Sequence, residues 1–352
     1  MGRRVDGLPP DKVTAFNLAG LRYSLSLSRA KTSESQSRVY KKYGAPFYEL
    51  ILAHPDFSKA EALYAFHGGL PLLKRAAELG MFKILEMYIA PMAARYELLA
   101  EEHRRWPGWE PPFPDRQAWE EGMELEREEC RLADILICPS EFVAAGYASL
   151  GAPSHKIRLV PYGVELDEFA GPRLPWDGRR PLRLLYVGAV ALGKGVQYLH
   201  QALKKLTDLP ITAHLVGGVI IEEPYRRTLA ARAELIGQVP RAEVKNHYSW
   251  ADVLVFPTSC DSFGLVQVEA MAAGLPVITT PNAGSVVRDG VDGFIVPIRD
   301  SEALAAKIEL LAKDPELLAW MSQNARQRAA EFSWERYGER LVNTCLKVIN
   351  QN

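Results

Sequence analysis

The sequence predicts an α/β fold in which two Rossmann-like domains face each other across a cleft. Short apolar runs such as Arg183–Val187 alternate with segments whose apolar residues recur at helical spacing, which is the pattern of parallel strands joined by helices. A chain of 352 residues that is 48% hydrophobic can bury the cores of two ordinary domains. A proline-rich stretch up to Pro181 separates the two series of elements and is expected to link the domains.

Four apolar segments predict the sheet of the first domain. They are Ala62–Phe66, Met81–Leu85, Asp134–Cys138 and Lys156–Val160. Helical spacing between them predicts helices at 70–79 and 115–132 and a third that is capped by Ser140 and ends near Gly151. The aromatic, proline-rich loop Trp106–Phe113 allows two interpretations, a stacking platform for a sugar acceptor or a loop held by its own packing.

Charge and composition narrow the class of protein. The net charge of −1 gives no reason to expect nucleic acid as a partner, and no apolar run approaches the roughly 20 residues that span a bilayer. The four cysteines lack metal-type spacing, which favours reduced thiols in a cytoplasmic protein. Residues 1–50 carry more basic than acidic side chains. This excess suits contact with an anionic acceptor or the cytoplasmic membrane face, or else a solvated arm.

The most informative stretch of the second domain is Pro257–Ile278. It follows the strand-like run Ala251–Phe256, and from Phe263 the apolar residues change to helical spacing until Gly274. The first N–H groups of a helix have no partner within it, and the helix dipole is positive there, so we expect this start to bind a phosphate. The residues of the expected cradle are Ser262, Phe263, Gly264 and Leu265.

Two acidic residues flank the cradle, Asp261 before it and Glu269 after it. Their separation of eight positions corresponds to at most about 12 Å of helix, which suits a ligand with a sugar at one end and a nucleoside ribose at the other. The simpler alternative is a helix-capping aspartate and an unrelated surface glutamate.

These residues resemble the donor-binding core of the retaining glycosyltransferases of family four, the group one glycosyltransferases, which have the two-domain GT-B fold. The family pattern is Glu-x7-Glu followed by Ala-Met-Ala-x-Gly-x-Pro-Val, and this chain has Asp261 at the first glutamate and Glu269 at the second. The resemblance implies that Asp261 contacts the donor sugar at the catalytic centre and that Glu269 holds the ribose hydroxyls. It also implies domains at 1–165 and 166–333, with a last helix at 334–352 that packs back on the first domain.

A second motif runs from Gly188 to Gly195. Gly-x4-Gly-Lys matches most of a P-loop, but Gly195 stands where a serine or threonine would bind Mg²⁺, which excludes an ATPase. The segment is similar to the family's Gly-Arg-x4-Lys-Gly, whose two cations neutralise the donor diphosphate. Lys194 fits as a catalytic residue, whereas Ala189 replaces the arginine. By resemblance, Gly188 also binds the donor, and the turn at Gly237 and Gln238 lies beside the nucleobase.

The start of the chain departs from the family. Domains of this fold open with a buried strand and a glycine-rich turn, and Met1–Pro10 contains neither. We therefore expect the first domain to lack its first strand and helix. The family's histidine after the following strand is also absent from Glu86–Pro91.

The resemblance implies transfer of a sugar, with retention of configuration, from a nucleotide-sugar donor to a glycan, lipid-linked or small-molecule acceptor, as in polysaccharide biosynthesis. No Asp-x-Asp motif is present, so we expect neither a metal ion nor another cofactor. The alternative is a degenerate partner subunit that binds the nucleotide sugar without turnover. Ala189 and Asp261 favour that alternative, and the intact Lys194, Gly264 and Glu269 favour the enzyme.

Overall fold

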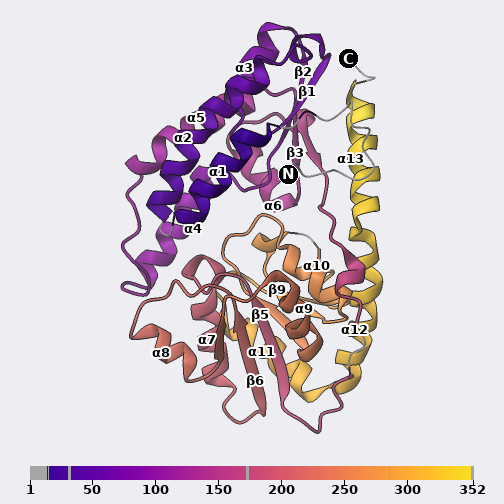
Figure 1. Cartoon of the computed structure of the whole chain (residues 1–352). Coiled ribbons are helices and arrows are strands. Elements are labelled where there is room, and N and C mark those ends of the chain that lie inside the picture. Colours follow the sequence, from indigo (N-terminus) through magenta and orange to yellow (C-terminus); the bar gives the residue numbers. More distant parts are fainter. Residues whose placement is uncertain (1–13, 15, 31–32, 172–173, 285, 350–352) are drawn as a thin grey trace.

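The computed structural model describes residues 14, 16–30, 33–171, 174–284 and 286–349, and it contains two parallel β-sheets (Figure 1). One sheet belongs to each of the two domains that the alternating sequence pattern predicts. Within each sheet, α-helices connect most of the consecutive strands, as is usual for a parallel arrangement.

The first sheet has four parallel strands in the order β1-β2-β3-β4. Their bounds are Ala62–Phe66 for β1, Phe82–Glu86 for β2, Ile135–Cys138 for β3 and Ile157–Leu159 for β4. All four predicted strands are therefore present, and the bounds of β1 agree at both ends. The connecting helices are α3 (Leu70–Glu78), α4 (Met92–Arg105), α5 (Gln117–Leu132) and α6 (Glu141–Ser149). The side chain of Ser140 accepts a hydrogen bond from the N–H of Val143, which confirms it as the cap of α6.

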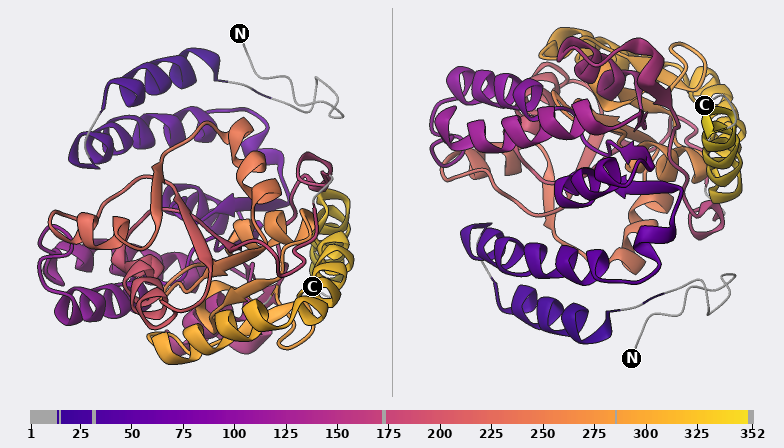
Figure 2. Two further views of the ribbon diagram at one scale, coloured as in Figure 1. Left: turned by 90° about the horizontal axis from the view of Figure 1, so that it is seen from below. Right: turned by 90° about the horizontal axis from the view of Figure 1, so that it is seen from above.

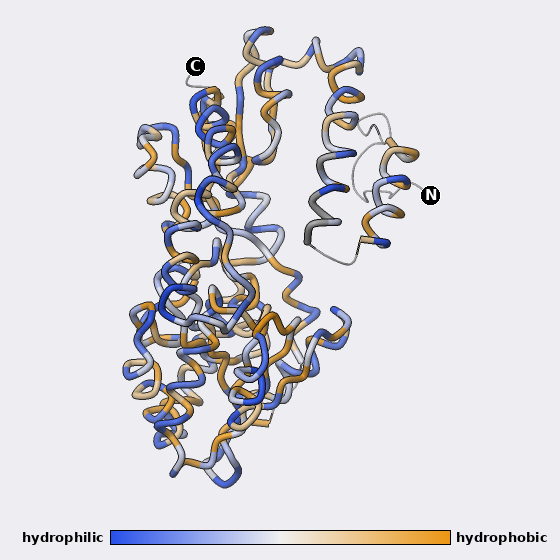
Figure 3. Tube along the Cα trace, turned by 90° about the vertical axis from the view of Figure 1, so that its left-hand side faces the viewer, coloured by the Kyte–Doolittle hydropathy of each residue, from blue (hydrophilic) through white to orange (hydrophobic). Residues whose placement is uncertain are grey.

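Strand β1 lies at an edge of this sheet, and among the described residues it pairs only with β2. The predicted lack of a first strand concerns Met1–Pro10, which lies outside the described residues. From Asn17 onward the basic segment forms two helices, α1 (Asn17–Arg29) and α2 (Ser33–Leu52), whose described side chains are mostly exposed or half-buried. They project away from the two sheets (Figures 2 and 3), and α2 contacts the first domain through the Tyr48 hydroxyl, which donates a hydrogen bond to the carbonyl of Gly68.

The second sheet has six parallel strands in the order β10-β9-β8-β5-β6-β7. Their bounds are Leu182–Val187 for β5, Ile211–Val216 for β6, Glu234–Gly237 for β7, Val253–Phe256 for β8, Val277–Thr279 for β9 and Gly293–Ile295 for β10. The order reverses between β5 and β8, which makes this a doubly wound sheet. A ligand site is expected where the carboxyl ends of β5 and β8 diverge.

The second domain contains a further set of α-helices, of which α10 is the one predicted between Phe263 and Gly274. They are α7 (Val196–Lys205), α8 (Tyr225–Ala230), α9 (Arg241–Trp250), α10 (Leu265–Ala272), α11 (Ser301–Lys313) and α12 (Pro315–Ala329). Helix α10 follows Gly264 and ends before Gly274, and both glycines have positive φ angles, of 62° and 79°. These conformations suit glycine, which has no Cβ.

The last helix, α13 (Trp334–Ile349), runs from the second domain back along the first (Figure 1). Its Val348 packs with Ile84 of β2 in a buried cluster on one face of the first sheet. The adjacent Leu85 points to the opposite face, as successive side chains of a strand do, and joins a separate cluster there. The predicted return of the last helix onto the first domain is confirmed.

Candidate functional site

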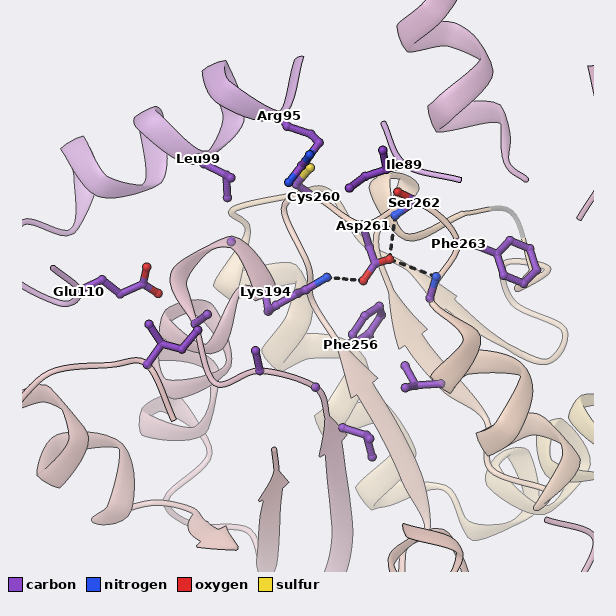
Figure 4. A pocket seen from close by; sticks show the side chains of 18 of the residues that line it. Ile89, Arg95, Leu99, Glu110, Lys194, Phe256, Cys260, Asp261, Ser262 and Phe263 are labelled. Atoms are coloured by element: carbon purple, nitrogen blue, oxygen red, sulfur yellow. Dashed lines mark hydrogen bonds and ion pairs between the residues drawn. The ribbon is translucent and has the colours of Figure 1, made fainter. Parts of the chain in front are cut away.

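A cavity of about 780 Å³ lies between the two domains at the carboxyl ends of β5 and β8 (Figure 4). This is the topological switch point at which open α/β sheets bind their ligands. Most of the residues singled out in the sequence line it, namely Gly188, Lys194, Asp261, Ser262, Phe263, Gly264 and Leu265. The first domain contributes Tyr88, Ile89, Arg95, Leu99, His103 and Glu110.

Close backbone contacts bring the two motifs together. A Cβ on Gly195, whose φ is 76°, would lie 1.9 Å from the carbonyl oxygen of Pro257, so this contact requires glycine. The N–H groups of Ser259 and Cys260 donate to the carbonyl of Gly193 at 3.1 and 3.2 Å. The turn that carries Lys194 is therefore fixed against the loop that follows β8.

Lys194 and Asp261 form an ion pair, with 2.5 Å between Nζ and Oδ2. The other carboxylate oxygen of Asp261 accepts hydrogen bonds from the N–H groups of Ser262 at 2.7 Å and Gly264 at 3.2 Å. The cradle predicted for a phosphate is thus occupied by the chain's own carboxylate. Asp261 is both the capping residue of the simpler alternative and a residue of the cavity wall.

Ser262 ties this loop to the first domain. Its hydroxyl accepts a hydrogen bond from the N–H of Ala90 at 3.1 Å, and its carbonyl accepts one from the hydroxyl of Ser140 at 2.5 Å. The loop therefore has polar contacts on both sides of the cleft, and its position depends on both domains.

Glu269 lies one helical turn beyond Leu265 and does not line the cavity. Its side chain is 8% exposed, and Oε2 accepts a hydrogen bond from the Tyr248 hydroxyl at 2.7 Å. Burial raises the pKa of Glu269 above its ordinary value, although the Tyr248 hydrogen bond and the charge of Arg241 oppose this. The turn at Gly237 and Gln238, at the end of β7, also lies outside the cavity wall.

His67 is directed at a buried carboxylate. Its Nδ1 lies 2.7 Å from Oε2 of Glu129, which also accepts from the N–H of Gly68. Burial lowers the pKa of His67, but Glu129 and Glu126 outweigh burial and leave the pKa raised. His67 does not line the cavity.

The aromatic loop after α4 packs into the second domain through its tryptophans, whereas Phe113 lines the cavity, so a stacking platform for an acceptor stays a prediction beside the observed packing. Trp109 is buried in the hydrophobic core of that domain, and its ring stacks on Tyr225 with 4.9 Å between centroids. Its carbonyl accepts a hydrogen bond from the N–H of Glu222 at 2.7 Å. The residues expected within the first domain at 1–165 therefore include a loop whose core contacts lie in the second.

Glu110, in the same loop, holds the turn that carries Lys194. One carboxylate oxygen accepts a hydrogen bond from the N–H of Leu192 at 2.5 Å, and the other lies 3.2 Å from Nε2 of His103. The sequence analysis assigned no role to Glu110 or to Arg95. In the sequence they are only charged residues at particular positions of α4 and of the loop after it. Their role depends on how α4 packs against the second domain.

Glu102, near the end of α4, joins the domains through a buried polar network. Its side chain has no exposed surface. One oxygen accepts from Arg299 Nε at 2.6 Å and from Ser259 Oγ at 2.9 Å, and the other accepts from the Tyr198 hydroxyl at 2.6 Å and from Gln197 Nε2 at 2.8 Å. All four donors belong to the second domain.

Neither a metal centre nor a membrane span is found among the described residues. No group of three or more His, Cys, Asp or Glu side chains there could hold a metal ion. No helix there has the length and apolar character needed to traverse a bilayer. Catalysis without a metal and peripheral membrane contact through the first domain both stay predictions.

Residues 177–328 match the model of the family described as glycosyl transferases group 1. The second domain belongs to this family. The group 1 domain contains the whole of β5–β10, the Lys194 turn and the Asp261 loop. The family resemblance predicted from the two motifs is confirmed.

Similar proteins extend the comparison into the first domain. A D-inositol 3-phosphate glycosyltransferase of Geodermatophilus obscurus is 38% identical over 217 residues, covering 54% of this chain and 47% of the relative. D-inositol 3-phosphate glycosyltransferase 1 of Catenulispora acidiphila is 28% identical over 323 residues, covering 84% and 71%. The chain spans about half the length of the first curated relatives that it matches, 47% and 56% of two of them.

Solved structures confirm the GT-B fold. The sucrose-phosphate synthase of Thermosynechococcus elongatus superposes with a TM-score of 0.68 at 22% identity, over 89% of this chain and 80% of that one. HepE of Anabaena in complex with UDP gives a TM-score of 0.67 at 17% identity, over 86% and 82%. At these identities the likeness concerns the fold alone.

Proposed function

We propose that the chain is a glycosyltransferase that moves a sugar from a nucleotide-sugar donor to an acceptor with retention of anomeric configuration. The observation that carries this proposal is the position of Lys194 and the start of α10. Both face an interdomain cavity at the switch point of a group 1 domain. The similar structure of HepE is a complex with UDP, which supports a nucleotide donor here.

The catalytic task of the site is to stabilise the charge that develops on the departing diphosphate when its bond to the sugar breaks. Lys194 and the N–H groups at the start of α10 are oriented before a donor binds, because Asp261 holds both of them. Preorganised donors lower a barrier without the cost of reorientation during the reaction. A diphosphate then takes over these donors in part, and Asp261 is freed to orient the donor sugar.

Glu269 has the role of binding the ribose. It lies on the same helix as the cradle, one turn beyond the cavity wall, and Tyr248 fixes its carboxylate. Reaching the ribose requires Glu269 to exchange part of this bond for a ribose hydroxyl. Gly188 would lie against the donor, and Gly237 with Gln238 beside the base.

The acceptor enters from the side of the first domain, whose residues form the other wall of the cavity. We infer a glycan, a lipid-linked sugar or a small glycoside as the acceptor. Inositol 3-phosphate belongs in any test panel, because the first similar proteins are named for it.

A partner subunit without turnover is the second candidate. It is favoured by Ala189 in place of the family's arginine and by the burial of Glu269 against Tyr248. A panel of nucleotide sugars, incubated with and without acceptors, separates the two. The enzyme releases nucleoside diphosphate from one donor and Lys194→Ala does not, whereas a partner subunit binds the donor and releases nothing.

A further inference from the structure

One face of α4 is seated on the second domain beside the candidate diphosphate site. Arg95, Leu99 and Glu102 are spaced four and three positions apart, so their side chains lie on the same side of the helix. Glu102 accepts the buried hydrogen bonds from the second domain, including that of Arg299. Leu99 packs against the backbone of Gly193, where a Cβ would come within 2.5 Å of Leu99 Cδ2.

Arg95 continues this face one turn toward the start of α4, about 6 Å beyond Leu99. Because Leu99 touches the residue before Lys194, Arg95 is placed at the cavity opposite the Lys194 turn, and both residues line it (Figure 4). Burial raises the pKa of the Cys260 thiol to about 11, and the charges of Arg95 and Lys194 both oppose that rise. The charges of Arg95 and Lys194 therefore both reach the thiol of Cys260 in the cavity wall.

Among the described residues, Arg95 differs from Lys194 and His103, the other basic side chains of the cavity, in forming no ion pair. Lys194 is paired with Asp261, and His103 lies next to Glu110. Throughout the described residues, no carboxylate lies within ion-pair distance of Arg95, whose guanidinium lies 5.6 Å from the centroid of the Trp119 ring. Burial raises the pKa of the Glu126 carboxyl, and the charge of Arg95 opposes that rise from beyond ion-pair distance. A partly buried guanidinium without a direct ion-pair partner can be stabilised by an anion that the ligand brings.

We propose that Arg95 binds the diphosphate of the nucleotide-sugar donor, as the second cation beside Lys194. This inference rests on the proposed function. Within the group 1 motif, Ala189 cannot provide the charge, and the first domain provides it instead across the cleft. A guanidinium can engage two phosphate oxygens at once. The diphosphate then bridges the domains, and its binding depends on the docking of α4 through Leu99 and Glu102.

Calorimetric titration of the full chain tests this. UDP, GDP and ADP are titrated first to find the nucleotide that binds, and its nucleoside serves as the uncharged probe. Arg95→Gln should lower the diphosphate affinity by about ten- to a hundredfold, the loss expected for charge-assisted hydrogen bonds. The nucleoside affinity should not change. Arg95→Lys keeps the positive charge but lacks the planar guanidinium that can bind two phosphate oxygens at once, so it should recover part of the loss.

Arg104→Gln is the matched control, because Arg104 lies on the same helix with its side chain 71% exposed and paired with Glu101. It should bind the diphosphate as the wild type does. Equal diphosphate affinity of Arg95→Gln and the wild type would overturn the inference and leave the proposed function standing. The inference would also be overturned if Arg95→Gln left the diphosphate affinity unchanged and raised only the KM for a phosphorylated acceptor. A wild type that binds no nucleoside diphosphate would overturn both.

Discussion

Glu102 of the first domain and Arg299 of the second form an ion pair, with 2.6 Å between Oε1 and Nε, in which the carboxylate is fully buried and the arginine side chain is 20% exposed. Arg299 has a φ of 66°, which is uncommon for a residue other than glycine, and it also donates to the carbonyl of Leu98 at 3.3 Å. A strained backbone conformation persists when its surroundings over-determine it. The pair therefore fixes the end of α4, and with it Leu99 and Arg95, against the donor-binding loops.

Removing one partner of this pair should destabilise the protein strongly. Arg299→Ala leaves the Glu102 carboxylate buried without its counter-charge, and such changes cost about 3–5 kcal/mol. The free energy of unfolding, measured by urea titration, should fall by that amount. The control is Arg336→Ala, whose pair with Glu339 is 63% and 60% exposed and should contribute about 1 kcal/mol or less. Equal effects of the two substitutions would contradict a stabilising role for the Glu102–Arg299 pair between the domains.

Lys194→Ala should impair turnover much more than folding. The lysine side chain is 30% exposed, so its loss creates no large buried defect. The charge on the leaving diphosphate is greatest in the transition state, and a lost donor of this kind costs about a hundredfold or more in kcat. Nucleoside diphosphate release and thermal melting should be measured on the same preparation. A variant that melts like the wild type and keeps its kcat would remove Lys194 from the mechanism.

The strands could be predicted because they depend on local pattern. β1 was expected at its observed bounds, Ala62–Phe66, since a short apolar run marks such a segment without reference to the rest of the chain. The Asp261 loop and the Lys194 turn were recognised in the same way, from glycines and charges at fixed spacing. Their meeting at one cavity follows from the doubly wound order.

The contribution of the first domain could not be predicted, because it depends on docking. Arg95 and Glu102 are charged residues on a helix, and their spacing alone indicates a solvated face. Only the seating of Leu99 on Gly193 turns that face toward the cavity. For the same reason the pattern showed Asp261 beside the cradle but not its carboxylate filling it. The helices α1 and α2 were also missed, since a proline and several polar residues interrupt their apolar pattern.

Glu269→Ala should weaken nucleotide binding. Loss of charged hydrogen bonds to the ribose hydroxyls costs about 1.5–3 kcal/mol. Calorimetry with the nucleoside diphosphate measures this directly, and Glu243→Ala is a suitable control because Glu243 is exposed on α9. Unchanged affinity of the Glu269 variant would rule out its assignment to the ribose.

The raised pKa of Glu269 predicts a pH dependence of stability that Glu269→Gln should lack. Above the ordinary value of 4.5, the unfolded carboxyl has lost its proton while the folded one still holds it. The folded state then binds more protons, so the free energy of unfolding falls as pH rises through this window. The free energy of unfolding of both proteins should be measured at several pH values across this window, by denaturant titration rather than by heating. Parallel curves for the wild type and the variant would show that burial does not control this carboxyl.

Activity should persist in EDTA. The charge on the departing diphosphate is met by Lys194 and the α10 N–H groups, with Arg95 as the further cation proposed above, so the residues of the cavity provide cationic and dipolar stabilisation without an added ion. Sugar transfer should therefore be equal in chelator and in Mg²⁺ or Mn²⁺ once a donor has been found. The sharper measurement uses Lys194→Ala and Arg95→Gln, whose losses should not be restored by either ion. A wild type that stops in EDTA and recovers with Mn²⁺ would show instead that a metal ion shares the diphosphate with these side chains.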